Sequence, residues 1–152
     1  MLDDTIRLAL LLHQRWLDGE SDGARADVSG TDFLGEDLSA WDFRRIVARG
    51  CNFTGARMPV RMQGGDFVGS IFANAFMDRS NVEECDFSSA DFRGASMYYT
   101  VVLNNAVITG ARFSDNVILW LLDIMLGIDF SESSSAIQAM VEGLRSAREA
   151  MS

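Results

Sequence analysis

The residues that most often carry catalysis are scarce in this chain. It contains one histidine, His13, and two cysteines, Cys51 and Cys85, and none of the common metalloprotease, hydrolase or nucleotide-binding motifs. A single imidazole cannot supply the clusters from which metal sites and acid–base sites are built. We therefore expect no enzyme, no metal and no cofactor, and we interpret His13 as a structural residue.

Carboxylates, in contrast, are abundant. The chain has 22 Asp and Glu residues against 13 Arg and no Lys, which gives a formal charge of −9. This charge disfavours direct binding to nucleic acid and favours a basic partner. The charge is also banded, because residues 1–43 and 62–91 are acidic whereas residues 44–61 contain arginine and no acid.

An apolar residue returns at every fifth position, a period that suits neither an α-helix nor a β-strand. Between Cys85 and Met97, for example, it falls on Phe87, Phe92 and Met97. One residue is missing from the series near Pro59 and one is added near Gly110, both at turn-forming residues. The series comprises Val28, Phe33, Leu38, Phe43, Ala48, Phe53, Met58, Met62, Phe67, Phe72, Met77, Val82, Phe87, Phe92, Met97, Val102, Val107, Phe113 and Ile118.

A small residue stands two positions before most members of the series, and Asp or Asn often stands one position before. Blocks such as A-D-F-R-G and C-N-F-T-G make residues 26–120 resemble the pentapeptide-repeat family. The resemblance implies an all-β solenoid, a right-handed quadrilateral β-helix of nearly five coils in which each pentapeptide forms one side. The central side chain then points to the axis, and residues twenty positions apart are stacked on one another.

Both ends of such a solenoid need covers, because its terminal coils expose unpaired backbone. We expect one domain over residues 1–152, with an N-terminal capping helix in 1–19, coils in 26–120 and a C-terminal cap in 121–152. Asp3 or Asp4 can begin the first helix, which should end at Gly19. Its apolar face would carry Ile6, Leu10, His13 and Leu17, and a second helix begun by Ser133 or Ser134 would carry Ile137, Met140, Val141 and Leu144.

The apolar run from Ile118 to Phe130 contains two aspartates and is too short to cross a bilayer. It is richer in large apolar residues than a lid requires, so either a homodimer interface or the well-packed lid of a monomer accounts for it. No basic n-region precedes the leucine run near the N-terminus, where Asp3 and Asp4 stand instead, and the two cysteines form no C-x-x-C pair. We therefore expect a cytoplasmic protein.

Some members of the family are acidic rods that imitate duplex DNA and occupy the DNA site of a target protein, notably DNA gyrase. Some phage-borne inhibitors of CRISPR effector complexes also act by DNA mimicry. Between Asp27 and Asp115, however, eight Arg residues offset twelve carboxylates, so only a local face could resemble DNA.

The best local face follows from stacking, which places Tyr98 over Asp78 and Ser96 over Phe76. Large apolar residues on the outside of this fold have no role in its core, so acids and aromatics together favour a binding site. We call this set the predicted partner surface, and it comprises Phe76, Asp78, Glu83, Glu84, Tyr98, Tyr99 and Val101. One hypothesis is DNA mimicry toward a DNA-binding protein, and the alternative is a protein–protein interaction scaffold without mimicry.

Overall fold

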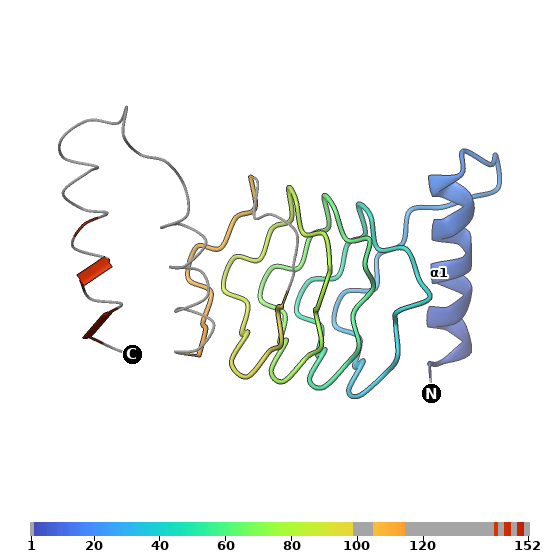
Figure 1. Ribbon diagram of the computed structural model, residues 1–152. Helices are drawn as coiled ribbons and strands as arrows, with labels where there is room; N and C mark the ends of the chain where they lie inside the picture. Colours follow the sequence, from blue (N-terminus) through green and yellow to red (C-terminus); the bar gives the residue numbers. More distant parts are fainter. Residues whose placement is uncertain (1, 99–104, 115–141, 143–144, 147–148, 151–152) are drawn as a thin grey trace, which may run out of the picture. The chain divides into compact units, whose positions relative to one another are not determined.

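The structure is a computed structural model that describes residues 2–98, 105–114, 142, 145–146 and 149–150 (Figure 1). The chain divides into two compact units, Met1–Phe113 and Ser114–Ser152, and each is described by itself. The first unit contains one helix followed by stacked coils. The expectation of a single domain over residues 1–152 stays a prediction.

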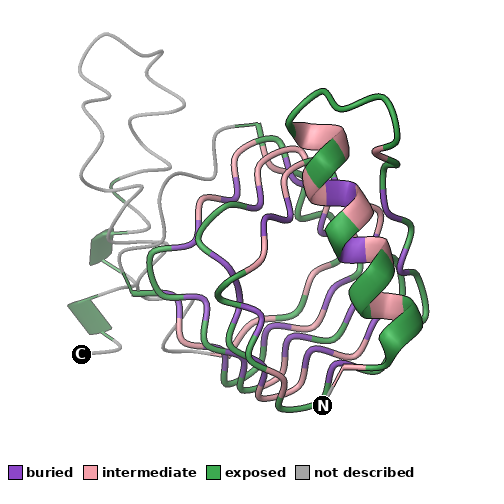
Figure 2. Cartoon of the chain, turned by 90° about the vertical axis from the view of Figure 1, so that its right-hand side faces the viewer, coloured by how far each residue is buried: buried purple, intermediate pink, exposed green. Residues whose placement is uncertain are grey.

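Helix α1 (Asp4–Leu17) begins where the sequence predicts it. The Asp3 carboxylate accepts a hydrogen bond of 2.8 Å from the Thr5 N–H, which caps the first turn. After the helix ends, Gly19 adopts a φ of +78°, a left-handed conformation that glycine tolerates without a steric cost. Leu10 and His13 are buried on one face of α1, which lies across the N-terminal end of the coils (Figure 2).

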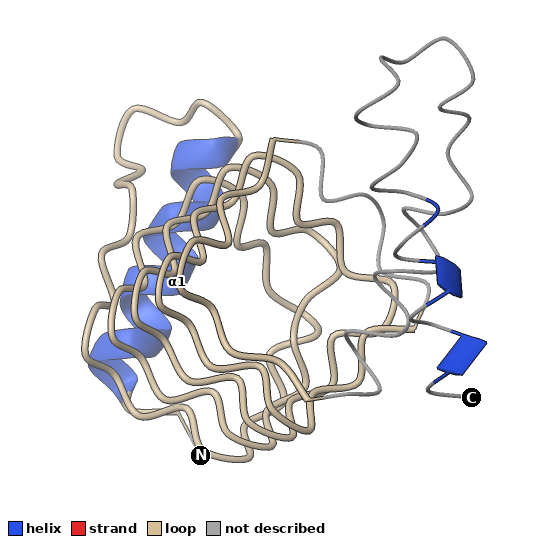
Figure 3. Ribbon diagram, turned by 90° about the vertical axis from the view of Figure 1, so that its left-hand side faces the viewer, coloured by secondary structure: helices blue, strands red, loops and turns tan. Residues whose placement is uncertain are grey.

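The coils form a β-solenoid whose successive turns are joined by parallel backbone bridges. Bridged residues lie about twenty positions apart and form columns parallel to the solenoid axis. In one column Val28 N–H donates to Val47 O at 2.8 Å, and Val47 N–H donates back to Ala26 O at 3.1 Å. Within the described part of the chain the bridges are isolated and form no longer strand, so Figure 3 shows the coils as loops.

Four columns of bridges surround the axis, one for each side of a coil. The first contains Asp27, Val47, Asp66, Asp86 and Val107; the second contains Asp32, Asn52, Ile71, Asp91 and Arg112; the third contains Asp37, Arg57, Phe76 and Ser96; the fourth contains Arg61 and Asn81. In each case except Val107, the residue after a bridge is a member of the five-residue series. Each pentapeptide that carries a bridge therefore contributes one residue to one of these columns, as expected for a β-solenoid.

The core is a set of stacked phenylalanine rings. Phe53 lies between Phe33 and Phe72, with ring centroids 5.0 and 4.9 Å away and nearly parallel planes. Rings in adjacent columns meet edge to face, as Phe72 and Phe87 do at 5.7 Å. Aromatic pairs of these geometries contribute roughly 0.5–1.5 kcal/mol each beyond their burial. The small residues two positions before the central ones are needed for this packing, because a Cβ at Gly65 would collide with the Phe67 ring.

The predicted interruption near Pro59 is confirmed, whereas the one near Gly110 is wrong. Met58 and Met62 lie on successive sides, since Arg57 bridges Phe76 and Arg61 bridges Asn81. Val107, however, bridges Asp86 and leaves 44% of its surface exposed, so it takes the position before the central one. The extra residue therefore precedes Val107.

Asp and Asn residues that precede the central position hold the following turn. Their side-chain oxygens accept a backbone hydrogen bond from two residues further on, as Asp27 does from Ser29 at 3.0 Å and Asn52 from Thr54 at 3.1 Å. Two residues after the central position the backbone turns through positive φ, most often at glycine. Arg45, Arg79 and Glu84 occupy this turn position with φ of 60°, 66° and 57°.

In the second unit, residues 142, 145–146 and 149–150 are helical and exposed. Arg145 and Glu142 form an ion pair of 3.8 Å, one turn apart. The predicted lid residues Ile137, Met140, Val141 and Leu144, the caps Ser133 and Ser134, and the run from Ile118 to Phe130 lie outside the described residues. Within the part of the chain that the structure describes, no helix is long and apolar enough to span a membrane.

Candidate partner-binding surface

His13 joins α1 to the coils through both ring nitrogens. The Ala26 N–H donates to Nδ1 at 3.1 Å, so Nε2 carries the proton and donates to the Arg44 carbonyl at 3.0 Å. The imidazole is fully buried, and burial is the main reason that the pKa of His13 is lowered. This arrangement fixes a neutral ring in a structural position.

The two thiols are also part of the core. Cys51 Sγ donates to Val28 O at 3.2 Å and Cys85 Sγ donates to Met62 O at 3.0 Å. Burial raises the pKa of Cys51 to about 11 and that of Cys85 to about 12. Both cysteines are free, and within the described part of the chain no three His, Cys, Asp or Glu side chains are grouped to hold a metal ion.

Several carboxylates on the coils are neutralised by arginines from the basic band. The Asp42 side chain is 1% exposed and accepts two-pronged hydrogen bonds from Arg44, at 3.0 and 2.8 Å. Arg61 approaches the same carboxylate at 3.1 Å. Burial acts to raise the pKa of Asp42, but the hydrogen bonds and charge of Arg44 outweigh it and the pKa is lowered.

Arginines from neighbouring coils or turns pair with further acids of the solenoid. Arg49 binds Asp66 at 2.6 Å, and Arg57 lies 3.9 Å from Asp37. Arg93 binds Asp91 at 2.6 Å, and its hydrogen bonds lower the pKa of Asp91 to about 2, with Arg112 adding a weaker attraction. Acidity is therefore cancelled locally over much of the described surface.

Asp78 and Tyr98 of the predicted partner surface lie on successive coils of the third column. The Tyr98 N–H donates to Asp78 Oδ1 at 2.8 Å, and the Ser96 hydroxyl donates to the same oxygen at 2.6 Å. The Tyr98 side chain is 63% exposed and that of Phe76, which bridges Ser96, is 49% exposed. The structure thus brings these aromatics and this acid together on one side.

Glu83 and Glu84 lie on the next side of the same coil. The Glu83 carbonyl accepts the Gly64 N–H at 2.9 Å, which places Glu83 over the preceding coil of that side. The Asn81 side chain binds Glu83 at both its N–H and its carboxylate. Tyr99 and Val101, the remaining members of the predicted partner surface, lie outside the described residues.

Sequence reasoning missed two neighbours of this surface. The Arg57 guanidinium lies 5.7 Å from the Phe76 ring centroid, a cation–π geometry. Val60 is 55% exposed, and its carbonyl accepts the Asn81 N–H. Counting back nineteen residues from Phe76 across the interruption near Pro59 would have found Arg57, and Val60 directly precedes Arg61, which bridges Asn81 at the usual twenty.

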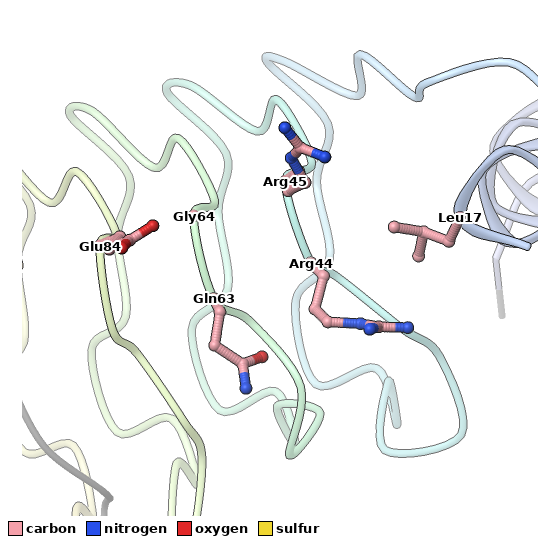
Figure 4. Close-up of a pocket in the computed structure, with 6 residues that line it drawn as sticks. All are labelled: Leu17, Arg44, Arg45, Gln63, Gly64 and Glu84. Carbon is pink, nitrogen blue, oxygen red and sulfur yellow. The ribbon is translucent and has the colours of Figure 1, made fainter. Parts of the chain in front are cut away.

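A groove runs along the side that carries Glu84 (Figure 4). Its volume is about 570 Å³, and Leu17 of α1 closes one end. The other lining residues come from three successive coils and are Arg44, Arg45, Gln63, Gly64 and Glu84. The groove therefore adjoins the acidic part of the predicted partner surface.

Comparison with known proteins agrees with this architecture. The family model described as pentapeptide repeats matches residues 61–98 in eight copies. Full-length QnrB1, a plasmid-mediated fluoroquinolone resistance protein, is 19% identical over 62% of this chain and 44% of its own, with a TM-score of 0.53. A trypsin-treated R167E form of QnrB1 gives the same TM-score at 18% identity, over 62% of this chain and 45% of that one.

The pentapeptide-repeat protein Rfr23 from the cyanobacterium Cyanothece 51142 is 18% identical over 60% of this chain and 59% of its own, at a TM-score of 0.35. No curated protein sequence matches the chain. The chain spans less than half the length of the QnrB1 chains, and that likeness concerns the fold. Residues 61–98 match the pentapeptide-repeat family, and the four columns of bridges, with an inward residue on each side, extend the same architecture from Asp27 to Arg112.

Proposed function

We propose that this protein binds a DNA-binding protein at its DNA site through the corner formed by Phe76, Asp78, Glu83, Glu84 and Tyr98. The observation that carries this proposal is the distribution of ion pairs. Asp37, Asp42, Asp66 and Asp91 are all paired with arginine. Within the described part of the chain, Asp78, Glu83 and Glu84 make no such pair, so their charge remains available to a basic partner.

Other unpaired acids of the coils stand without exposed rings. Asp27 and Asp86 are also influenced by the charge of Arg49, and Asp32, which accepts a hydrogen bond of 2.9 Å from the Asn52 amide, lies in the second column. Among the described residues, the large exposed rings are those of Phe76 and Tyr98, and both belong to this corner. Rings surrounded by charge are typical of the anchors of protein interfaces, where aromatic contact supplies affinity and charge supplies steering.

The proposed role is non-enzymatic and requires no cofactor. The family resemblance supplies one candidate target, DNA gyrase, and DNA mimicry by phage-borne inhibitors supplies a second, a CRISPR effector complex. The protein would inhibit or protect its target by occupying the DNA site. We place it in the cytoplasm, where such targets act. The same proposal includes a right-handed solenoid of nearly five coils with a C-terminal lid. It also includes Tyr99 and Val101 as further contacts, and the pairing of two copies through residues 118–130.

A protein–protein interaction scaffold without mimicry is the second candidate. It is favoured by the exposed Phe76 and Tyr98 rings and by Arg57, which brings positive charge beside Phe76. Binding by such a surface would depend on apolar contact and would vary little with salt. Binding by the acids would weaken steeply as salt screens their attraction.

Competition with duplex DNA separates the two candidates. We expect the protein to displace a labelled duplex from purified gyrase or from a CRISPR effector complex, with an apparent affinity that falls as salt rises. The double charge reversal Glu83→Lys, Glu84→Lys should abolish displacement.

The matched control is Glu20→Lys, Asp22→Lys, which changes the net charge equally in the loop after α1. These two acids are exposed and pair with Arg15, a contact that contributes about 1 kcal/mol or less. The control should displace DNA nearly as well as the unmodified protein. Binding to the target that leaves its DNA in place, or that survives the Glu83 and Glu84 reversals, contradicts the mimicry proposal and supports the scaffold.

A further inference from the structure

The groove beside Glu84 contains a hydrogen-bond acceptor that the protein leaves unused. The Oε1 atom of Gln63 is buried and has no hydrogen-bond partner among the described residues. Burying a carbonyl without a donor is costly, so such atoms are rare in folded proteins and call for an explanation. Because the terminal torsion of glutamine is soft, the amide can turn this oxygen toward the groove.

The charges around the groove are not equally available. Arg44 is held by both carboxylate oxygens of Asp42, which Arg61 also approaches, so its guanidinium is engaged by a carboxylate outside the groove lining. Arg45 lies over the Trp16 ring of α1 at 5.7 Å, at the far end. Glu84 makes no ion pair within the described part of the chain, and Gly64 places no side chain between it and Arg45. The end of the groove beside Gln63 and Glu84 is thus negative.

The backbone at Glu84 determines where its side chain leaves the coil. Its φ is 57°, and the residue that stacks on it in the preceding coil is Gly64, with a φ of 68°. Glycine is the residue that this turn accommodates without strain. Arg45, at the other end of the groove, occupies the same turn position with a φ of 60°, and both charged residues are exposed.

We propose that this groove accepts one arginine or lysine side chain of the partner, which donates hydrogen bonds to Gln63 Oε1 and to the Glu84 carboxylate. This inference rests on the proposed function, since the groove adjoins the same acidic corner, and it specifies the chemistry of the partner. Arg45 stands two coils from Glu84, about 10 Å at the usual strand spacing. The groove therefore selects a single basic residue and repels a second one at the Arg45 end.

The probe is N-acetyl-arginine methylamide, titrated into the full-length protein at low salt and followed by NMR or calorimetry. We expect saturable binding in the range of about 1 mM, as for a single buried contact of this kind. The matched ligand is N-acetyl-citrulline methylamide, which has nearly the same shape but no charge, and it should bind at least about tenfold more weakly.

Two substitutions that each remove one negative charge test the position of the site. Glu84→Gln should weaken arginine binding about tenfold, because it removes a charge-assisted hydrogen bond. Glu83→Gln removes the same charge from a residue that does not line the groove, and it should change the affinity little. Equal losses from both variants, or equal binding of the citrulline and arginine ligands, would overturn the proposal.

Gln63 gives a readout that a structural role would not produce. Gln63→Leu should raise the melting temperature of the free protein, because it removes an unpartnered polar atom, and should weaken arginine binding. A lower melting temperature with unchanged affinity contradicts the assignment. These titrations use no partner protein, so the groove can fail while DNA competition succeeds, and DNA competition can fail while the groove still binds arginine.

Discussion

The imidazole of His13 is the residue on which the junction between α1 and the coils depends. It accepts from the Ala26 N–H and donates to the Arg44 carbonyl, so it satisfies one backbone group on each of two coil segments. The contact with Ala26 requires the neutral ring, because a proton on Nδ1 would face the Ala26 N–H, whereas Nε2 can donate to the Arg44 carbonyl in either protonation state. Protonation of His13 is therefore linked to the stability of the junction between α1 and the coils.

The linkage predicts a loss of stability in mild acid. The pKa of His13 is lowered in the folded state, mainly by burial, so its contribution is fully present above the unfolded pKa of about 6.5 and is lost as pH falls through the folded pKa. The free energy of unfolding, measured in urea between about pH 7.5 and pH 5, should decrease in the unmodified protein. His13→Gln should remove most of that decrease, and an unaltered slope in this variant would contradict the structural role.

The two thiols should be inert until the protein unfolds. Because burial raises the pKa of Cys51 to about 11 and that of Cys85 to about 12, almost no thiolate exists near pH 8. A chromogenic disulfide reagent should react with neither cysteine in the native protein and with both in denaturant. Rapid native reaction of one equivalent would show that a coil is open at that cysteine.

Single residues also show what the sequence could and could not predict about the surface. The prediction that residues twenty positions apart are stacked correctly placed Tyr98 over Asp78, because the backbone alone determines which residues share a column. The pairing of Asp42 with Arg44 and Arg61 was not predictable, since it depends on how long side chains turn at a corner. The sequence therefore predicted the position of the acids but not which of them stay unpaired.

At the level of the coil, the period of five predicted which residues point inward. Phe33, Phe53, Phe72 and Phe92 form one stack at intervals close to 5 Å, as a column of central residues requires. The error at Val107 has a simple cause. Val107 and Ile108 are adjacent and both apolar, so either could continue the series, and only the bridge from Val107 to Asp86 decides between them.

Two phenylalanines four residues apart provide the test at this scale. Phe72 is fully buried between stacked rings, and Phe76 is 49% exposed on the third column. Phe72→Ala should lower the free energy of unfolding by about 3–5 kcal/mol, because it leaves a cavity in the core. Phe76→Ala should cost roughly 0.5 kcal/mol or less. Denaturant titration measures both, and equal losses would contradict the inward period of five.

For the whole molecule, the important property is the location of the carboxylates that no arginine pairs with. The sequence gives a net charge of −9 and a basic band in residues 44–61, which excluded uniform imitation of DNA. The structure adds that arginines neutralise acids on all four sides but leave Asp78, Glu83 and Glu84 unpaired within the described residues. A small acidic corner with exposed aromatics is therefore the expected contact for a basic partner.

Affinity capture with elution by duplex DNA tests this claim most directly. The protein is immobilised, exposed to a bacterial lysate, washed, and eluted with duplex DNA or with buffer of matched ionic strength. We predict that a DNA-binding protein is released by the duplex alone, is retained by the Glu20→Lys, Asp22→Lys control, and is absent from the Glu83→Lys, Glu84→Lys variant. Retention of the same protein by both variants, with no release by DNA, would contradict the account.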